Sequence, residues 1–313
     1  MVRGWKAWTA LWIVYLVWGS TYLAVKVSVR TLPPLLSAGL RFIVAGLLLA
    51  GILAVRRTPL RVPWREALAA VGVGVALLAF GAGVVALAET RIDSSIAAMI
   101  AGSVPLQVIV CRTIARERVA TATKLSAVVG LAGLLLIIVP TGFSGGSTAI
   151  GLAMMLGSAF AWSTGSYVSR SLPLPRDAFV ATVYEMLGGG AVLVVGALAL
   201  GEGGDISAGE VSAASLGAWL YLVVAGSLVA FTAYAWLLQN APISQVVTHQ
   251  YVNPLVAIGL GALILGETLD ATTAIGAVIV IGAVFATIRS ESQQTEQPPV
   301  VEERSAAPSV RAK

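Results

Sequence analysis

Two charged side chains, Arg41 and Glu185, lie inside long apolar stretches of this 313-residue sequence. A charge at the centre of a bilayer costs about 2.5–3.5 kcal/mol even on insertion scales, so such residues face a bundle interior, a cavity or a partner. Arg41 could there bind a substrate carboxylate, and Glu185 could take up a cation or a proton. The alternative for both is a structural ion pair or a charge that caps backbone groups, and the Arg41 side chain could also extend outward to the membrane surface.

The densest polar patch lies in a later apolar stretch. Gln245, His249 and Asn253 recur every four residues and therefore share one face of a helix. Pro254 removes a backbone donor and frees the carbonyl of Gln250, which predicts a helix break that could contact a ligand. His249 could also titrate near neutral pH and couple transport to protons. Plain hydrogen bonding between helices is the alternative for the whole patch.

Aromatic side chains recur in two further apolar stretches. Trp18 and Tyr22 lie in the first, and Trp162 and Tyr167 lie later in the chain. At this depth they could form the wall of a cavity and stack on an organic substrate or cation. Aromatic residues near helix ends are more usually interfacial anchors, which is our interpretation of Trp8.

The sequence lacks the usual patterns of soluble enzymes and metal sites. It has one cysteine and one histidine, and it contains no HExxH, GxSxG or Walker A pattern. We therefore expect no enzyme activity, no catalytic residue, no cofactor and no metal ion. Uphill transport by such a chain would need an ion gradient, with protons as the candidate coupling ion, or an exchange reaction.

The composition places these residues in a membrane protein. The chain is 58% hydrophobic and 11% charged, with a mean hydropathy of +0.89. Soluble domains are roughly 45–50% apolar and about 25% charged. The lipid bilayer is thus the expected partner, and the net charge of +5 indicates basic cytoplasmic loops, not nucleic-acid binding.

A helix needs about 20 apolar residues to cross the ~30 Å hydrocarbon core. The continuous apolar runs predict an all-α integral membrane protein with ten transmembrane helices, at 8–27, 34–55, 66–87, 94–114, 122–139, 149–168, 177–200, 213–238, 244–265 and 271–288. Most of the 20 basic residues fall on one side if both termini are cytoplasmic. The positive-inside rule then predicts a multi-pass protein of the cell (inner) membrane with that orientation.

The two halves of the chain resemble each other in register. A nearly constant offset pairs Trp18 with Trp162 and Arg41 with Glu185, and a slightly longer one pairs Pro105, a second predicted break, with Pro254. We expect two five-helix repeats at 1–143 and 144–288, followed by a disordered cytoplasmic tail at 289–313. Because five is odd, the second repeat enters the membrane inverted, an architecture that supports alternating access to a midplane site.

Several segments resemble the EamA family of the drug/metabolite transporter superfamily. They are VWGSTYLA at 17–24, LPP at 32–34, GLRF at 39–42, NP at 253–254 and GE at 266–267. The resemblance covers residues 8–288. It implies a ten-helix secondary transporter, in a family mostly of exporters of amino acids and other small metabolites.

We therefore expect a secondary active transporter that exports amino acids or other small metabolites by alternating access. An importer or exchanger of sugars, nucleotide-linked sugars or lipid-linked intermediates is the alternative within transport. A membrane-embedded enzyme would need convergent catalytic groups that the sequence does not supply, and a helical scaffold would not need intramembrane charges.

Overall fold

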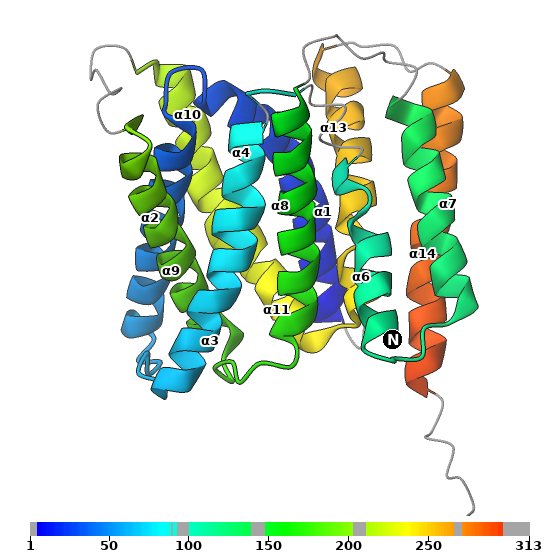
Figure 1. The fold of residues 1–313 in the computed structure, drawn as a ribbon, viewed down its shortest axis with the longest axis horizontal. Helices are drawn as coiled ribbons and strands as arrows, with labels where there is room; N and C mark the ends of the chain where they lie inside the picture. Colours follow the sequence, from blue (N-terminus) through cyan, green and yellow to red (C-terminus); the bar gives the residue numbers. More distant parts are fainter. Residues whose placement is uncertain are drawn as a thin grey trace, which may run out of the picture.

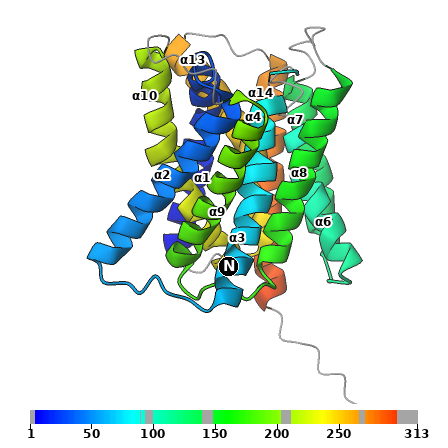
Figure 2. The ribbon, with the colours of Figure 1, turned by 60° about the vertical axis from the view of Figure 1, so that its left-hand side comes forward.

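The computed structural model describes residues 5–88, 90–92, 100–138, 148–202, 211–265 and 271–296. Within these ranges every regular element is a helix, and the helices form one upright bundle (Figures 1 and 2). Their bounds are α1 (Trp5–Ser28), α2 (Pro34–Val55), α3 (Trp64–Gly74), η1 (Val75–Gly83), α4 (Val84–Ala88), α6 (Val104–Ile114), α7 (Thr121–Ile138), α8 (Ala149–Ser169), α9 (Ala178–Ala199), α10 (Ala213–Tyr221), η4 (Leu222–Phe231), α11 (Thr232–Asn240), α12 (Ile243–Val246), α13 (His249–Leu265) and α14 (Ala271–Glu296).

Five of the described helical stretches are long and apolar enough to cross a membrane. They are Pro34–Val55, Trp64–Ala88, Ala178–Ala199, Ala213–Asn240 and Ala274–Gln293. Shorter apolar helices occur at Val104–Ile114 and Thr121–Ile137. Many large apolar side chains on the outside of the bundle are exposed, among them Leu47, Val195 and Phe285. Such a surface is expected where lipid covers the protein.

Three boundaries differ from the sequence-based expectation. α14 continues to Glu296, so residues 289–296 of the expected tail are helical, and the rest of the tail lies outside the described residues. The interruption in the stretch 244–265 lies between α12 and α13, at residues 247 and 248, whereas Pro254 lies inside α13. Proline removes one donor only, so the neighbouring turns carry the helix past it. The interruption near Pro105 lies directly before α6, and Pro105 occupies its first turn.

The start of α1 and the end of α14 lie at the same end of the bundle, the lower end in Figure 1. We call this the N/C end and the opposite one the far end. The connection between α2 and α3, which carries several arginines, lies at the N/C end as well (Figure 2). The connection between α1 and α2 lies at the far end.

The helices pack in matched pairs. α2 packs most extensively against α9, and α7 against α14. The backbones of α2 and α9 approach closely because glycines face each other: a Cβ on Gly39 would lie 3.0 Å from the Gly190 carbonyl oxygen, and one on Gly190 would lie 2.9 Å from that of Gly39. α1 packs against α13 and η4, whereas α8 packs against α6 and η1. All of these contacts join the first half of the chain to the second half.

A π-helical segment lies in each half of the described chain. η1 interrupts the helical stretch from α3 to α4, and η4 interrupts that from α10 to α11. π-helical turns are rare and often lie at functional sites. These two segments are therefore regions where a ligand site would be expected.

Gly74, the last residue of α3, allows this helix to touch α9. A Cβ at this position would overlap the backbone of Glu185. Forcing extra atoms into a packed contact typically costs 1–3 kcal/mol. We therefore expect Gly74→Ala to lower the free energy of unfolding by about 1–3 kcal/mol, measured as a lower melting temperature of the detergent-solubilised protein. Gly72 on the same helix has open space around it, so Gly72→Ala should leave stability unchanged or raise it, and equal losses would contradict the prediction.

Candidate substrate-binding cavity

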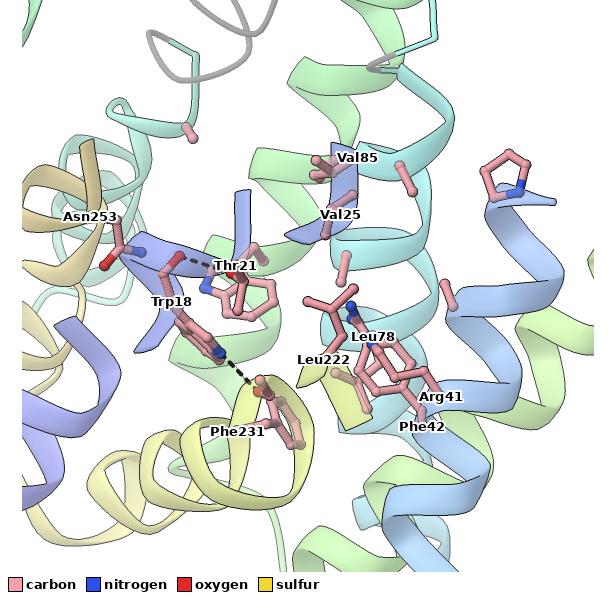
Figure 3. A pocket seen from close by; sticks show the side chains of 18 of the residues that line it. Trp18, Thr21, Val25, Arg41, Phe42, Leu78, Val85, Leu222, Phe231 and Asn253 are labelled. Atoms are coloured by element: carbon pink, nitrogen blue, oxygen red, sulfur yellow. Dashed lines mark hydrogen bonds between the residues drawn. The ribbon is translucent and has the colours of Figure 1, made fainter. Parts of the chain in front are cut away.

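A cavity of about 180 Å³ lies inside the bundle (Figure 3). Its walls come from α1, α2, η1, α4, α6, α8, α10, η4 and α13. Ser28, Pro34 and Ser37 line it where α1 ends and α2 begins, and Val85 lines it at the start of the short helix α4. These helix ends lie at the far end of the bundle, so the cavity extends toward that end.

Four aromatic rings pack together at the deeper part of the cavity. Trp18 lies 5.5 Å from Trp162, 5.0 Å from Tyr234 and 5.0 Å from His249, measured between ring centroids. Trp18, Trp162 and His249 line the cavity, whereas Tyr234 is fully buried and bonded to Ser166 at 2.7 Å. We call these four residues the aromatic floor. Trp18 meets Trp162 and His249 edge-on and Tyr234 at a tilt, and edge-on packing is a favourable geometry for aromatic rings.

The aromatic floor is anchored to both π-helical segments. The Trp18 Nε1 donates to the carbonyl of Gly226 in η4 at 3.0 Å. In the other half, Ser158 donates to the carbonyl of Gly81 in η1 at 2.9 Å, and a Cβ on Gly81 would lie 2.8 Å from the Trp162 ring. Each tryptophan thus packs against a glycine of the π-helical segment from the opposite half.

Arg41 is the charged residue in the wall of the cavity. Its guanidinium carbon lies 4.3 Å from the centroid of the Phe42 ring, and its Nε atom is buried without a hydrogen-bond partner. Within the described residues no carboxylate forms an ion pair with it. Arg41 is only partly exposed, and a largely enclosed cation without a counter-ion is costly, so this wall favours an anionic ligand.

The opposite side of the cavity is polar but uncharged. Asn253 lies across the cavity from Arg41 in Figure 3. It is 2% exposed, and its Oδ1 atom has no hydrogen-bond partner. Gln250 lines the cavity one turn earlier on α13. An unpaired amide oxygen can accept a hydrogen bond from a ligand, such as one from an ammonium group.

The structure brings most of the residues singled out from the sequence to this one cavity. These are Trp18, Arg41, Trp162, His249, Gln250 and Asn253. Tyr167 lies elsewhere, because it is near the end of α8 and donates to Glu117 at 2.8 Å. The side chain of Tyr22 lies outside the described part of the structure.

Glu185 does not line the cavity. It is 3% exposed on α9, where its backbone touches α3, and its Oε2 atom has no hydrogen-bond partner. Within the described residues it forms no ion pair with Arg41 or another base. The structural ion pair considered for the two residues is therefore absent from this conformation.

Other lining residues were not predicted from the sequence. Phe42, Trp219 and Phe231 supply apolar surface, and Ser37 and Ser158 line the polar parts. Trp219 is held in place by a 2.8 Å bond from its Nε1 to the Ser37 carbonyl. Serine and apolar residues are common throughout the spans, so only the position of Phe42 beside Arg41 could have indicated a role.

The chain matches the profile of the EamA-like transporter family twice, over residues 6–139 and 149–289. It is 34% identical over 266 residues to an uncharacterized inner membrane transporter, YedA, of Escherichia coli K12, and the match covers 83% of each chain. An uncharacterized transporter of Archaeoglobus fulgidus is 23% identical, with 91% of this chain and 99% of that one covered. The fold is similar to a solved crystal structure with a TM-score of 0.73 and 19% identity, covering 93% of this chain and 99% of that chain.

An all-helical bundle with a central cavity and two matches to one transporter profile is a membrane transporter. The chain belongs to the EamA-like transporter family.

Proposed function

We propose that the protein is a secondary active transporter of the cell membrane that carries a small organic carboxylate through the cavity by alternating access. The observation that carries the substrate class is Arg41, a partly buried cation in the cavity wall whose Nε atom has no hydrogen-bond partner and to which no carboxylate is paired among the described residues. The aromatic floor offers a surface for an apolar part of the substrate. Asn253 offers an acceptor for an ammonium group, so amino acids fit both ends of the cavity.

The helix pairing supports an inverted repeat of two five-helix units. The pairs α2–α9 and α7–α14 join equivalent helices of the two halves, and the partners run in opposite directions. The contacts of α1 with α13 and η4 correspond to those of α8 with α6 and η1. The double match of the family profile agrees with this division. Such repeats provide two mirror-related conformations, which alternating access requires.

The basic residues support a cytoplasmic N/C end. Arg61 and Arg116 lie in connections at that end, and the far end would then face outward. On this orientation the structure is an outward-facing state, and export would proceed by release into the far-end opening.

Cysteine labelling tests this topology. In intact cells, a membrane-impermeant maleimide should react with a cysteine at Arg30, which lies between α1 and α2, but with one at Arg61 only after permeabilisation. Both substitutions need Cys111 replaced by alanine. Labelling of both positions from the same side would contradict the expected topology.

Counterflow in proteoliposomes tests the function. Vesicles loaded with an unlabelled amino or organic acid should take up the same labelled acid, and protein-free vesicles should not. A thermal-shift screen of amino acids, sugars and cationic drugs selects the acid to use. Chemical conversion of the compound without movement across the membrane would indicate an enzyme instead.

A further inference from the structure

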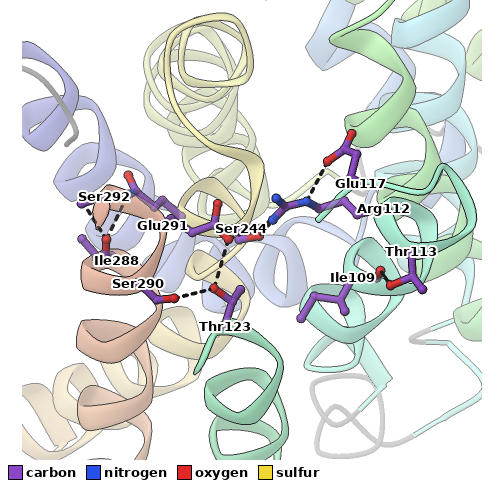
Figure 4. Close-up of polar contacts among 11 residues, drawn as sticks. Ile109, Arg112, Thr113, Glu117, Thr123, Ser244, Ile288, Ser290, Glu291 and Ser292 are labelled. Carbon is purple, nitrogen blue, oxygen red and sulfur yellow. Dashed lines mark hydrogen bonds and ion pairs between the residues drawn. The ribbon is translucent and has the colours of Figure 1, made fainter. Parts of the chain in front are cut away.

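A group of charged and hydroxyl side chains connects several helices at the N/C end (Figure 4). Arg112, in the last turn of α6, is its centre. Its Nε donates to Glu117 at 2.9 Å, and its Nη1 donates to Glu291 on α14 at 2.9 Å and to Ser244 on α12 at 2.6 Å. Arg112 and Glu291 are 7% and 4% exposed, so this ion pair is shielded from water. We call Arg112, Glu117, Ser244 and Glu291 the Arg112 cluster.

Each side of the Arg112 cluster is held by further contacts. On one side, Tyr167 of α8 donates to Glu117 at 2.8 Å, and α6 itself packs against α8. On the other side, Thr123 of α7 donates to Glu291 at 3.1 Å, while α14 packs extensively against α7 and also contacts α12. The bonds from Arg112 to Glu291 and Ser244 therefore cross from an α6–α8 side to an α7–α12–α14 side.

The charges of the cluster are those of a formed ion-pair network. Burial acts to raise the pKa of Glu117, but hydrogen bonds from Tyr167 and Arg112, together with the charges of Arg112 and Arg170, outweigh it and hold that pKa below its usual range. Glu117 is thus a carboxylate at neutral pH and orients Arg112 from its own side. From the other side of the bundle, the Glu291 carboxylate forms an ion pair with the same guanidinium.

The cluster lies at the end where the cavity is closed. The cavity is lined by the first residues of α6, Val104 among them, but by none of the four cluster residues. Between the aromatic floor and the N/C end, Tyr15 of α1 bonds to Thr248 at 2.6 Å, and Val108, one turn before Arg112 on α6, is fully buried. For a substrate to pass from the cavity to the N/C end, the Tyr15–Thr248 contact and the contacts of α6 with α12 and with Glu291 would have to separate.

We propose that Arg112 is the latch of a gate at the N/C end, whose bonds to Glu291 and Ser244 hold the gate shut while the cavity is open at the far end. This inference rests on the proposed alternating-access function. Opening the gate requires these two cross-bundle contacts to break, whereas the Arg112–Glu117–Tyr167 contacts can move together with α6 and α8. Removing the latch therefore favours the conformation that is open at the N/C end.

The labelling rates of two single-cysteine reporters, measured in detergent, test the latch without any substrate. With Cys111 replaced by alanine, Val25→Cys reports the far-end cavity and Val108→Cys reports the closed end. Arg112→Gln should speed maleimide labelling at position 108 by about five-fold or more, the lower end of typical coupling effects, and slow labelling at position 25. Glu291→Gln should act in the same direction. Arg118→Gln is the control. Arg118 is exposed in the connection between α6 and α7, which also carries Glu117, and it has no ion pair within the described structure.

A charge exchange separates a latch from general loosening of the bundle. The double variant Arg112→Glu with Glu291→Arg, made together with Glu117→Gln so that the new glutamate does not face a carboxylate, should return both labelling rates toward those of the parent. Unchanged rates in Arg112→Gln would overturn the proposal. So would faster labelling at both positions without recovery in the double variant, because that result indicates partial unfolding. Labelling requires no transport. Failure of the counterflow experiment would therefore refute the proposed function, and the labelling rates could still be interpreted on their own.

Discussion

Replacing Arg41 by glutamine should abolish the selectivity of the transporter for a carboxylate. Hydrogen bonds to charged groups are worth about 1.5–3 kcal/mol, which corresponds to roughly 10- to 150-fold in affinity. Arg41 Nε is buried in the cavity wall without a partner, so a substrate carboxylate would supply its missing counter-ion. We expect Arg41→Gln to weaken counterflow of the acid by that factor.

The comparison of an acid with its amide makes this result independent of expression and folding. The parent protein should prefer the acid, and Arg41→Gln should carry the acid and the amide equally. Arg41→Lys should recover part of the preference, since lysine keeps the charge but not the planar donor geometry. Arg30→Gln is the matched control, because Arg30 is exposed near the far-end mouth and does not line the cavity. A variant that still prefers the acid would show that Arg41 does not bind the substrate.

Glu185→Gln should uncouple transport from a proton gradient. Burying an isolated carboxylate is costly unless it carries a proton, and Glu185 is buried without an ion pair in the described structure. The backbone of Glu185 touches Gly74 of α3, directly before η1, which forms part of the cavity wall. A change in the charge of Glu185 would therefore act close to η1. We propose that Glu185 binds and releases a proton as the two conformations interchange.

Glutamine keeps the shape of the protonated side chain but cannot release a proton. In proteoliposomes with an imposed pH gradient, Glu185→Gln should therefore lose gradient-driven accumulation and retain counterflow, which needs no net proton movement. The matched control is Glu66→Gln, which changes a partly exposed carboxylate in the first turn of α3. Unchanged accumulation in Glu185→Gln would exclude it as the coupling site, and His249 in the aromatic floor would be tested next.

The sequence predicted the helical residues well, because hydropathy is a local property. For example, the predicted and observed bounds of the helix Pro34–Val55 coincide. It also singled out candidate site residues, since a polar residue inside an apolar span has few places to face other than a cavity or a partner. Of these candidates, Arg41, Trp18, Trp162, His249, Gln250 and Asn253 line the one cavity, whereas Tyr167 and Glu185 do not. Boundaries were less well predicted at α14, where polar residues after 288 continue the helix on the strength of contacts such as that of Thr123 with Glu291.

Tertiary contacts decided the roles that the sequence left open. Tyr167 and Tyr22 each lie in the second half of their helix, and the sequence suggested a ligand contact for both. The Tyr167 hydroxyl instead donates to Glu117 at the N/C end. Arg112, Glu117 and Glu291 had no visible relation, because an ion pair across the bundle depends on which helices become neighbours. The π-helical turns in η1 and η4 likewise form where Trp18 and Trp162 pack against them.

Composition and periodicity therefore determined that this chain is an all-helical membrane protein and which polar residues are unusual within it. The tertiary structure decided which of those residues share one cavity, that Glu185 lies behind its wall, and that Arg112 joins the two sides of its closed end. The physical reason is the sequence distance over which each property is determined. Whether a segment is buried in lipid depends on its own residues, whereas a binding site or a gate depends on contacts between residues that are far apart in the sequence.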